Sequence, residues 1–151
     1  MKKKSSCGFK MYMRLSAVIR ELYSEKRRSS PATGSGEWLA DNYYLIYRRS
    51  RRLLDSFARM PNLPVENGDI RILDICRTFL TLDRDPKVET FDRVVEEAAA
   101  QTPLQNAELD MLPAFLEFAC FELIGNSAEA GDTKEIARAI KLLRFCSGYD
   151  F

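Results

Sequence analysis

The sequence of 151 residues contains no histidine. Histidine is the commonest general base near neutral pH and the commonest metal ligand, so its absence removes the usual centre of hydrolytic and metal-dependent chemistry. A glycine-rich phosphate loop is missing too, because Gly34 and Gly36 precede a predicted helix but follow no strand. We therefore expect a protein that is not an enzyme and has no catalytic residues, cofactor or metal.

Cysteine is scarce and widely spaced. The four cysteines, Cys7, Cys76, Cys120 and Cys146, form no Cys-x-x-Cys pair, so the close spacing of a zinc site is missing. The last three fall within apolar helical patterns and are predicted to be small core residues. Thiols used in this way are typical of proteins from a reducing compartment.

Long apolar runs are absent as well. No stretch of the sequence approaches the roughly 20 apolar residues that a membrane helix needs. The first 22 residues resemble a signal peptide only superficially, because Lys10 and Arg14 interrupt the apolar stretch and no small-residue cleavage site follows. We expect a cytoplasmic protein with no membrane span.

Charge is unevenly distributed along the chain. Residues 1–60 hold 14 Lys and Arg against 5 Asp and Glu, whereas residues 61–151 hold 9 against 17. A basic half can bind nucleic acid or anionic lipid, or the two halves can face each other within the fold. We favour the second interpretation.

Apolar residues recur at helical spacing along most of the chain, and no segment combines strand alternation with hairpin chemistry. The pattern predicts a single all-α domain over residues 1–151, a compact bundle of five or six helices packed as antiparallel αα pairs. The expected helices span about 9–26, 36–59 and 105–124, with others after Asp69, at Asp85-Pro86 and after Asp132. Residues 1–8 are predicted to form a disordered basic tail, and residues 27–36 a flexible linker.

Two predicted helices carry the strongest core signals. The helix over 36–59 has a seam with steps of three and four residues: Leu39, Tyr43, Ile46, Ser50, Leu53 and Phe57. The helix over 105–124 is apolar nearly all round, which predicts a central position. We place Leu109, Leu112 and Leu116 on its main inward face. Pro113 should bend this helix and Gly125-Asn126 should end it.

Carboxylates are plentiful, which raises the question of glycosidase-like catalysis. The neighbouring pairs are Asp83 with Asp85, Glu96 with Glu97, and Glu108 with Asp110. A glycosidase needs two carboxylates across a cleft, one of them with a raised pKa. Adjacent acids at exposed helix ends are more often a solvated surface, and Glu108 is predicted to serve the start of its helix.

The segment EWLADNYY gives a candidate partner or ligand surface formed by Trp38, Asp41, Asn42 and Tyr44. Aromatic rings beside amides and acids suit the recognition of hydroxyl groups. The alternative interpretation is structural, with Trp38 and Asn42 both buried and the Asn42 amide paired to the backbone of a neighbouring connector. We favour the structural interpretation.

The run YRRSRR gives a candidate anion-binding site formed by Arg48, Arg49, Arg51 and Arg52. With the neighbouring tyrosines these arginines have the composition of a phosphate-gripping, base-stacking surface. In helical geometry, however, they fan over more than half of the circumference. Solvation and ion pairs to the acidic second half are the simpler interpretation.

Three stretches together resemble one known family. GEWLADNYYLIYRR (36–49), NLPVENGDIRILDICRTFL (62–80) and TPLQNAELDMLPAFLEFACFELI (102–124) are similar, in order and spacing, to the soluble helical N-terminal region of bacterial cyclic β-1,2-glucan synthases. The similarity covers about residues 30–126. The chain departs from the family pattern at Asp110, where the family has tryptophan, and at Gln105, where it has threonine.

The resemblance implies a helical scaffold and a setting beside a glucan-making enzyme. Members of the family are large membrane proteins with a UDP-glucose-dependent glycosyltransferase, and this chain has no counterpart of that domain, so their activity is not carried over. We expect a non-catalytic helical scaffold or protein-interaction module, whose protein partner is a glucan-synthesising membrane enzyme. The alternative is a basic-surface adaptor that binds nucleic acid or anionic membrane through the N-terminal lysines (Lys2, Lys3, Lys4) and the four arginines.

Tryptophan fluorescence tests the interpretation of the EWLADNYY segment, because Trp38 is the only tryptophan. If the segment is structural, emission should be blue-shifted and poorly quenched by iodide. Red-shifted, readily quenched emission would instead place Trp38 in an open groove with Asp41 or Tyr44.

Overall fold

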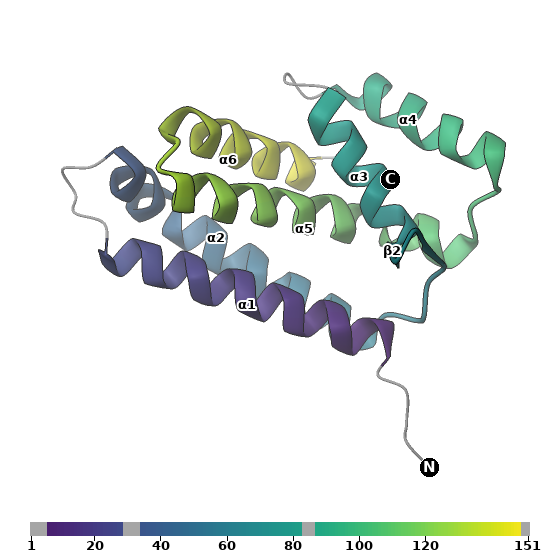
Figure 1. The fold of residues 1–151 in the computed structure, drawn as a ribbon, viewed down its shortest axis with the longest axis horizontal. Coiled ribbons are helices and arrows are strands. Elements are labelled where there is room, and N and C mark those ends of the chain that lie inside the picture. The colour runs from purple at the N-terminus through teal and green to yellow at the C-terminus, as the bar shows by residue number, and fades with distance from the viewer. Residues whose placement is uncertain (1–5, 29–33, 83–86, 149–151) are drawn as a thin grey trace, which may run out of the picture.

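A computed structural model describes the backbone of residues 6–28, 34–82 and 87–148, and within these ranges all side chains except those of 25–28, 34–41 and 147–148. The described chain forms six helices and one short hairpin (Figure 1). The elements are α1 (Cys7–Arg28), α2 (Gly34–Arg59), β1 (Val65–Glu66), β2 (Asp69–Ile70), α3 (Arg71–Leu82), α4 (Val88–Gln101), α5 (Asn106–Ala130) and α6 (Thr133–Gly148). The predicted all-α bundle is confirmed.

Helix α5 lies at the centre of the bundle and packs against α1, α2, α3 and α6. Its apolar side chains point in every direction, so only helices on several sides can cover them. Phe115, Phe118 and Phe121 are all essentially buried, as is Leu116. The predicted central position of this helix is confirmed. In Figure 1, α1 and α2 form an antiparallel pair on one side of α5, whereas α4 lies on the opposite side and packs chiefly on α3.

Helix α5 is longer than predicted. It continues through Gly125 and Asn126 and ends at Ala130, where Gly131 adopts φ 69° and caps the helix in the left-handed conformation. Glycine inside a helix costs only about 1 kcal/mol relative to alanine. Burial of Ser127 and Ala128 in the next turn extends the packed surface beyond that point. The prediction for Leu109 is also wrong, because this side chain is 42% exposed.

The ends of α1 and α2 differ from the prediction. Helix α1 begins at Cys7 and ends at Arg28, and α2 begins at Gly34, so residues 7–8 of the predicted tail and residues 27–28 and 34–36 of the predicted linker are helical. The Ser6 hydroxyl caps this start of α1 by accepting a hydrogen bond from the Phe9 N–H at 3.0 Å, and Gly8 permits close packing there. A Cβ at this position would lie 2.4 Å from the carbonyl oxygen of Phe57, so only glycine lets α1 approach the end of α2 this closely. Residues 1–5 and 29–33 lie outside the described part.

The segment between α2 and α3 contains a hairpin, contrary to the expectation of no hairpin chemistry. Asn67 and Gly68 have φ values of 55° and 83°, and Val65 pairs with Ile70 across the two short strands. Two successive residues with positive φ are the mark of the Asn-Gly hairpin turn. Helix α3 begins at Arg71, so Ile70, and not Asp69, stands directly before it. The prediction that Asp69 caps this helix is therefore wrong. The Asp69 carboxylate instead accepts a hydrogen bond from the Ile70 N–H.

The other predicted helix starts had mixed outcomes. Asp132 accepts a hydrogen bond from the Glu135 N–H at 3.2 Å, which confirms the predicted cap of α6. Helix α4 begins at Val88 with Lys87 as its N-cap, two residues after the predicted start, and Asp85-Pro86 lies outside the described residues.

Truncation of Leu116 tests the position of the core. Leu116 is fully buried on α5, so Leu116→Ala should lower the free energy of unfolding by about 2–5 kcal/mol through lost burial and a cavity. Leu109→Ala, on the same helix but 42% exposed, is the matched control and should cost clearly less. Urea unfolding followed by circular dichroism measures both. Equal losses would show that the helix is rotated relative to the bundle.

Candidate functional site

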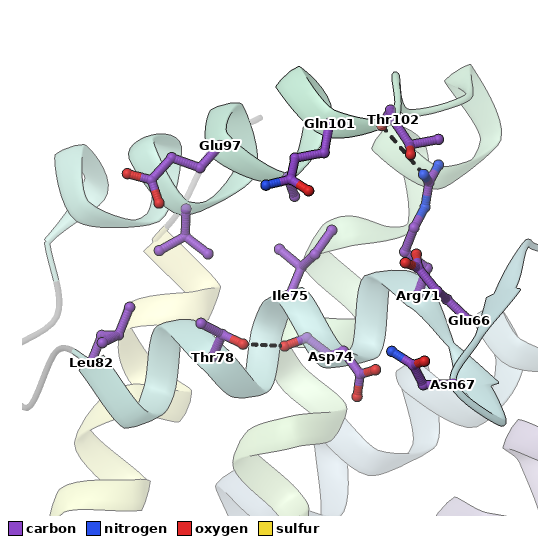
Figure 2. A pocket seen from close by; sticks show the side chains of 12 residues that line it. Glu66, Asn67, Arg71, Asp74, Ile75, Thr78, Leu82, Glu97, Gln101 and Thr102 are labelled. Carbon is purple, nitrogen blue, oxygen red and sulfur yellow. Dashed lines mark hydrogen bonds between the residues drawn. The ribbon is translucent and has the colours of Figure 1, made fainter.

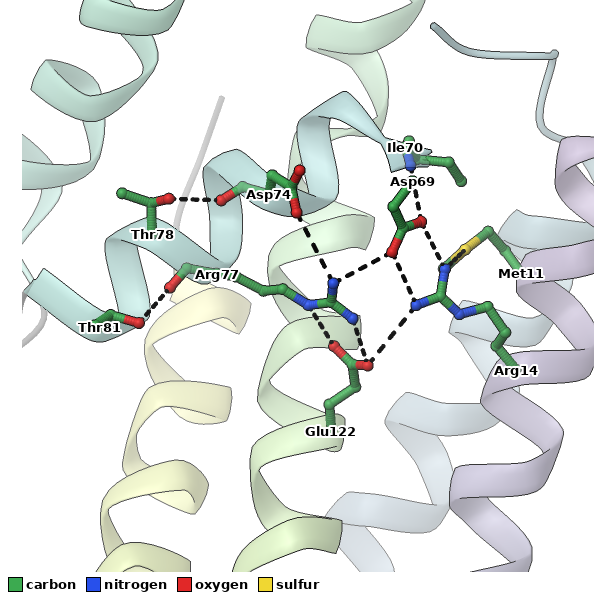
Figure 3. A network of polar contacts seen from close by, with 9 residues as sticks. All are labelled: Met11, Arg14, Asp69, Ile70, Asp74, Arg77, Thr78, Thr81 and Glu122. Atoms are coloured by element: carbon green, nitrogen blue, oxygen red, sulfur yellow. Dashed lines mark hydrogen bonds and ion pairs between the residues drawn. The ribbon is translucent and has the colours of Figure 1, made fainter. Parts of the chain in front are cut away.

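A network of charged side chains joins the hairpin to three helices (Figure 3). Arg14 of α1 binds Asp69 at 2.9 Å, and Arg77 of α3 binds both Asp69 at 3.3 Å and Glu122 of α5 at 2.7 Å. Burial raises the pKa of the Asp69 carboxyl, but the hydrogen bonds from Arg14 and the Ile70 N–H, with both arginine charges, outweigh it and lower that pKa below its usual value. The network stabilises the packing of α1 and α3 on α5.

Arg49, one of the four predicted anion-binding arginines, forms a second ion pair. Nε of Arg49 donates to Glu117 of α5 at 2.9 Å, and both side chains are largely buried. Burial raises the pKa of the Glu117 carboxyl, and the Arg49 charge only partly opposes that effect. Together with the Arg14–Glu122 contact, this pair confirms that part of the basic first half faces the acidic second half.

The most deeply buried charges are Arg71 and Glu108. Nε of Arg71 donates to Glu108 at 2.9 Å, and its Nη2 also binds this carboxylate, whose side chain is fully buried. Glu108 also accepts the Gln105 N–H in a capping box, which confirms its predicted role at the start of α5. Burial raises the pKa of Glu108, but Arg71 and the Gln105 N–H lower it overall. The arginine partner was not predicted from the sequence.

A polar groove of about 360 Å³ lies between α3 and α4, beside Arg71. Its lining includes the carboxylates Glu66, Asp74 and Glu97 together with amide and hydroxyl side chains. Figure 2 shows Glu66 and Glu97 at opposite ends of the groove, and the Thr78 hydroxyl bonded to the Asp74 carbonyl. Two carboxylates that act on one bond must flank it. The groove does not bring Glu66 and Glu97 together in that way.

The remaining acidic pairs lie on the surface. Glu96, Glu97 and Asp110 are exposed, whereas Glu108 is held in its ion pair. Asp83 and Asp85 lie outside the described residues. Across the ranges that the structure describes, no group of three or more Cys, Asp or Glu side chains is arranged to hold a metal ion.

Three of the cysteines are core residues, as predicted. Cys76 and Cys120 are fully buried and Cys146 is nearly so. Burial raises the pKa of the Cys76 thiol. The sulfur atoms of Cys120 and Cys146 lie 3.6 Å apart, and this contact together with burial raises the pKa of the Cys120 thiol. Thiols held protonated in this way are poor nucleophiles.

The EWLADNYY segment is only partly described. Asn42 is buried, as the structural interpretation requires. Its side-chain oxygen accepts a hydrogen bond of 2.7 Å from Arg144 of α6, a partner that the sequence did not predict. Tyr44 is 70% exposed. The side chains of Trp38 and Asp41 lie outside the described residues, so the four predicted surface residues are not shown to form one site.

The four arginines of YRRSRR likewise do not form one site. Arg49 faces α5, whereas Arg48, Arg51 and Arg52 are exposed. The guanidinium of Arg48 lies 5.5 Å from the centre of the Tyr44 ring, and that of Arg51 lies 5.9 Å from the centre of the Tyr47 ring. Within the described part of the chain, these two arginines stack on tyrosines and make no ion pair.

The exposed apolar side chains gather on α1 and α2. Ten large hydrophobic side chains are exposed among the described residues, and six of them belong to this one helix pair: Phe9, Tyr12, Met13, Tyr23, Tyr44 and Tyr47. These six exposed side chains of α1 and α2 are here called the outer α1/α2 surface.

An apolar groove of about 170 Å³ runs along this surface between the two helices. Ile19 and Tyr23 of α1 face Tyr43, Tyr47 and Leu54 of α2 across a floor that includes Leu22 and Ile46. The rings of Tyr43 and Tyr47 stack with their centres 6.3 Å apart. We did not predict this groove from the sequence.

Comparison with known proteins adds no relative, since no family model, curated protein or solved structure matches the chain. No helix in the described ranges is both long and apolar enough to cross a membrane.

Replacement of Arg71 tests the buried ion pair. Arg71→Met leaves the Glu108 carboxylate buried without its partner and should cost about 3–5 kcal/mol at pH 7. Asp110→Ala, an exposed acid two residues further along α5, should change stability by less than about 0.5 kcal/mol.

The loss should also depend on pH in a definite direction. In the native chain the pKa of Glu108 is lowered, so its contribution to stability is present above the unfolded pKa and is lost as the pH falls through the folded pKa. Without Arg71, burial raises this pKa, and protonation in the folded state relieves the penalty as the pH falls. The difference in unfolding free energy between the native chain and Arg71→Met should therefore shrink as the pH falls from 7 to 4. A difference that is independent of pH would contradict the ion-pair interpretation.

Proposed function

We propose that this chain is a non-catalytic helical module that binds a protein partner through its outer α1/α2 surface. The carrying observation is the concentration of exposed aromatic and apolar side chains on that one helix pair. Exposed apolar side chains that occur singly need no explanation, but a contiguous apolar patch is typical of an interaction site. Two of the six side chains, Tyr23 and Tyr47, line the apolar groove between the helices, and Tyr12 lines an adjoining hollow that shares Arg51 and Leu54 with it.

The composition of the surface supports a protein partner. Tyrosine and arginine are enriched in the parts of interfaces that carry most of the binding energy, because they offer large rigid area with a polar tip. Tyr44 with Arg48, and Tyr47 with Arg51, form two such stacked pairs on α2. Stacking holds the long arginine side chains in place before a partner arrives, which reduces the entropy lost on binding.

The use of the carboxylates supports the non-catalytic part of the proposal. Glu108, Glu117 and Glu122 on α5 each bind an arginine of another helix. A carboxylate neutralised in this way by the packing of the core serves stability and is not presented to a substrate.

The setting of the module comes from the resemblance to cyclic β-1,2-glucan synthases. The region of similarity, residues 30–126, includes α2, α3 and α4 and most of α5, but not α1. On this ground we place the module in the cytoplasm beside a glucan-synthesising membrane enzyme. Four of the six side chains of the proposed binding surface belong to α1, which lies outside the similar region.

One observation favours a second candidate function, a basic adaptor for nucleic acid or anionic membrane. Arg48, Arg51 and Arg52 are exposed, and the described part of the chain gives none of them an ion pair. Binding of that kind depends on counterion release, so its affinity should fall steeply with salt concentration, whereas binding through the apolar groove should respond far less.

Site-specific photo-crosslinking in cells tests the proposal. The photoreactive residue p-benzoylphenylalanine in place of Tyr47 should give a discrete protein adduct after irradiation, because this side chain lies on the groove. The same residue in place of the exposed Glu96 on α4 is the matched control and should give none. Equal adducts from both positions, or no adduct from Tyr47, would contradict the proposal. An adduct removed by nuclease would favour the second candidate.

A further inference from the structure

We propose that the groove between α1 and α2 binds an amphipathic helix of the partner, one that carries acidic side chains beside its apolar stripe. This inference rests on the proposed function and specifies the partner's chemistry. Three features support it: the length and direction of the groove, the nature of its walls, and the charge of its rim.

The lining of the groove has helical spacing. Tyr43, Tyr47 and Leu54 follow one another on α2 with steps of four and seven residues, and Ile19 and Tyr23 of α1 are four residues apart. An adjoining hollow, which shares Arg51 and Leu54 with the groove, is lined by Tyr12 of α1. Eleven residues of helix correspond to about 16 Å. The α2 side of the groove therefore extends over about three helical turns, and the groove with the adjoining hollow reaches a similar length along α1, the antiparallel neighbour of α2 (Figure 1). This length matches an apolar stripe at positions i, i+4, i+7 and i+11 of a third helix.

The walls of the groove favour a helix over an extended peptide. Both walls are helices, whose backbone N–H and C=O groups bind within the same helix and offer no edge for strand pairing. An extended peptide here would lose water from its backbone without gaining hydrogen bonds in return. A helix satisfies its own backbone and presents only side chains. The apolar lining provides contacts for side chains alone.

The charge of the rim selects an acidic partner. Among residues 6–24 and 42–59, the exposed cations are Lys10, Arg20, Arg48, Arg51, Arg52 and Arg59, and the exposed acids are Glu21 and Asp55. Asp55 is already paired with Arg59 at 3.4 Å. Arg51 lines the groove itself, directly beside Tyr47. A carboxylate that flanks an apolar stripe would meet Arg51 at the groove, whereas a lysine in the same place would be repelled.

A labelled peptide tests the inference on the full chain. The probe is an 18-residue helical peptide with leucines at i, i+4, i+7 and i+11 and glutamates on both flanks, followed by fluorescence anisotropy. Two control peptides have lysine in place of glutamate, or the same residues in scrambled order. We expect the acidic peptide to bind at least tenfold more tightly than either control.

Matched variants locate the binding. Arg51→Glu should weaken the acidic peptide at least tenfold and strengthen the lysine peptide, a reversal that loss of folding cannot produce. Tyr47→Ala should weaken the acidic peptide while the melting temperature stays close to that of the native chain. Arg93→Glu, an equally exposed arginine on α4, should change binding less than twofold.

Each other outcome overturns the inference. Equal binding of the scrambled or lysine peptide, or no binding of any peptide, would reject the acidic helix. If phosphatidylglycerol vesicles or oligothymidylate bind more tightly than the acidic peptide, and Arg51→Glu abolishes that binding, the rim belongs to lipid or nucleic acid. Self-association abolished by Tyr47→Ala would assign the groove to a second copy, with its acidic α4 as the bound helix. If crosslinking at Tyr47 succeeds while the acidic peptide fails, only the partner's chemistry is wrong. If both fail, the proposed function fails as well.

Discussion

The structure depends on the burial of α5, a helix that is apolar on nearly every side yet carries glutamates at 108, 117 and 122. Burial of its aromatic residues requires neighbours on several sides, and each glutamate must then find a positive charge because an unpaired carboxylate at such a position is costly. Arg71, Arg49 and Arg77 supply those charges from α3 and α2. The apolar surface provides the free energy of packing, and the ion pairs fix which face of α5 meets which helix.

This arrangement also explains the uneven distribution of charge along the chain. Arg14 and Arg49, from the basic first half, neutralise acids of the second half and contribute to the fold. Arg48 and Arg51 lie close to Arg49 in sequence but point in other directions around α2, where they stack on tyrosines. One arginine-rich run thus serves two purposes, because successive residues of a helix point in different directions.

The sequence predicts the helices and most of the core, because their periodicity is a local property of the chain. The buried residues Ile46, Ser50, Leu53 and Phe57 follow the predicted seam of α2. Errors arose where a local signal competes with a distant contact. Glycine is typical of helix ends, but α5 continues past Gly125 to Ala130 because the residues beyond it pack in the core. The Asn67-Gly68 turn was a readable hairpin signal, overlooked because the flanking strands have only two residues each.

The candidate surface is less predictable than the fold, because it depends on which apolar side chains no other helix covers. The tyrosines of α1 and α2 follow a second helical stripe beside the buried seam, and a stripe of this kind looks the same in sequence whether another helix covers it or not. The partner of Asn42 shows the same limit, since Arg144 lies 102 residues away in the chain.

Gly8 has a further consequence for the groove. Because it lets the backbone of α1 approach the Phe57 carbonyl directly, the separation of α1 and α2 at that end is set by main-chain atoms, which cannot adjust by rotamer changes. The hydrogen bond from the Cys7 N–H to the Asn62 side chain, 2.9 Å long, holds the same end of α1 to the connector. Substitutions along the groove, at Tyr23 or Tyr47, can therefore change which side chains it accepts while the Gly8 end of the helix pair stays fixed. Specificity can diverge on this scaffold without any change in the packing of the helices beneath it.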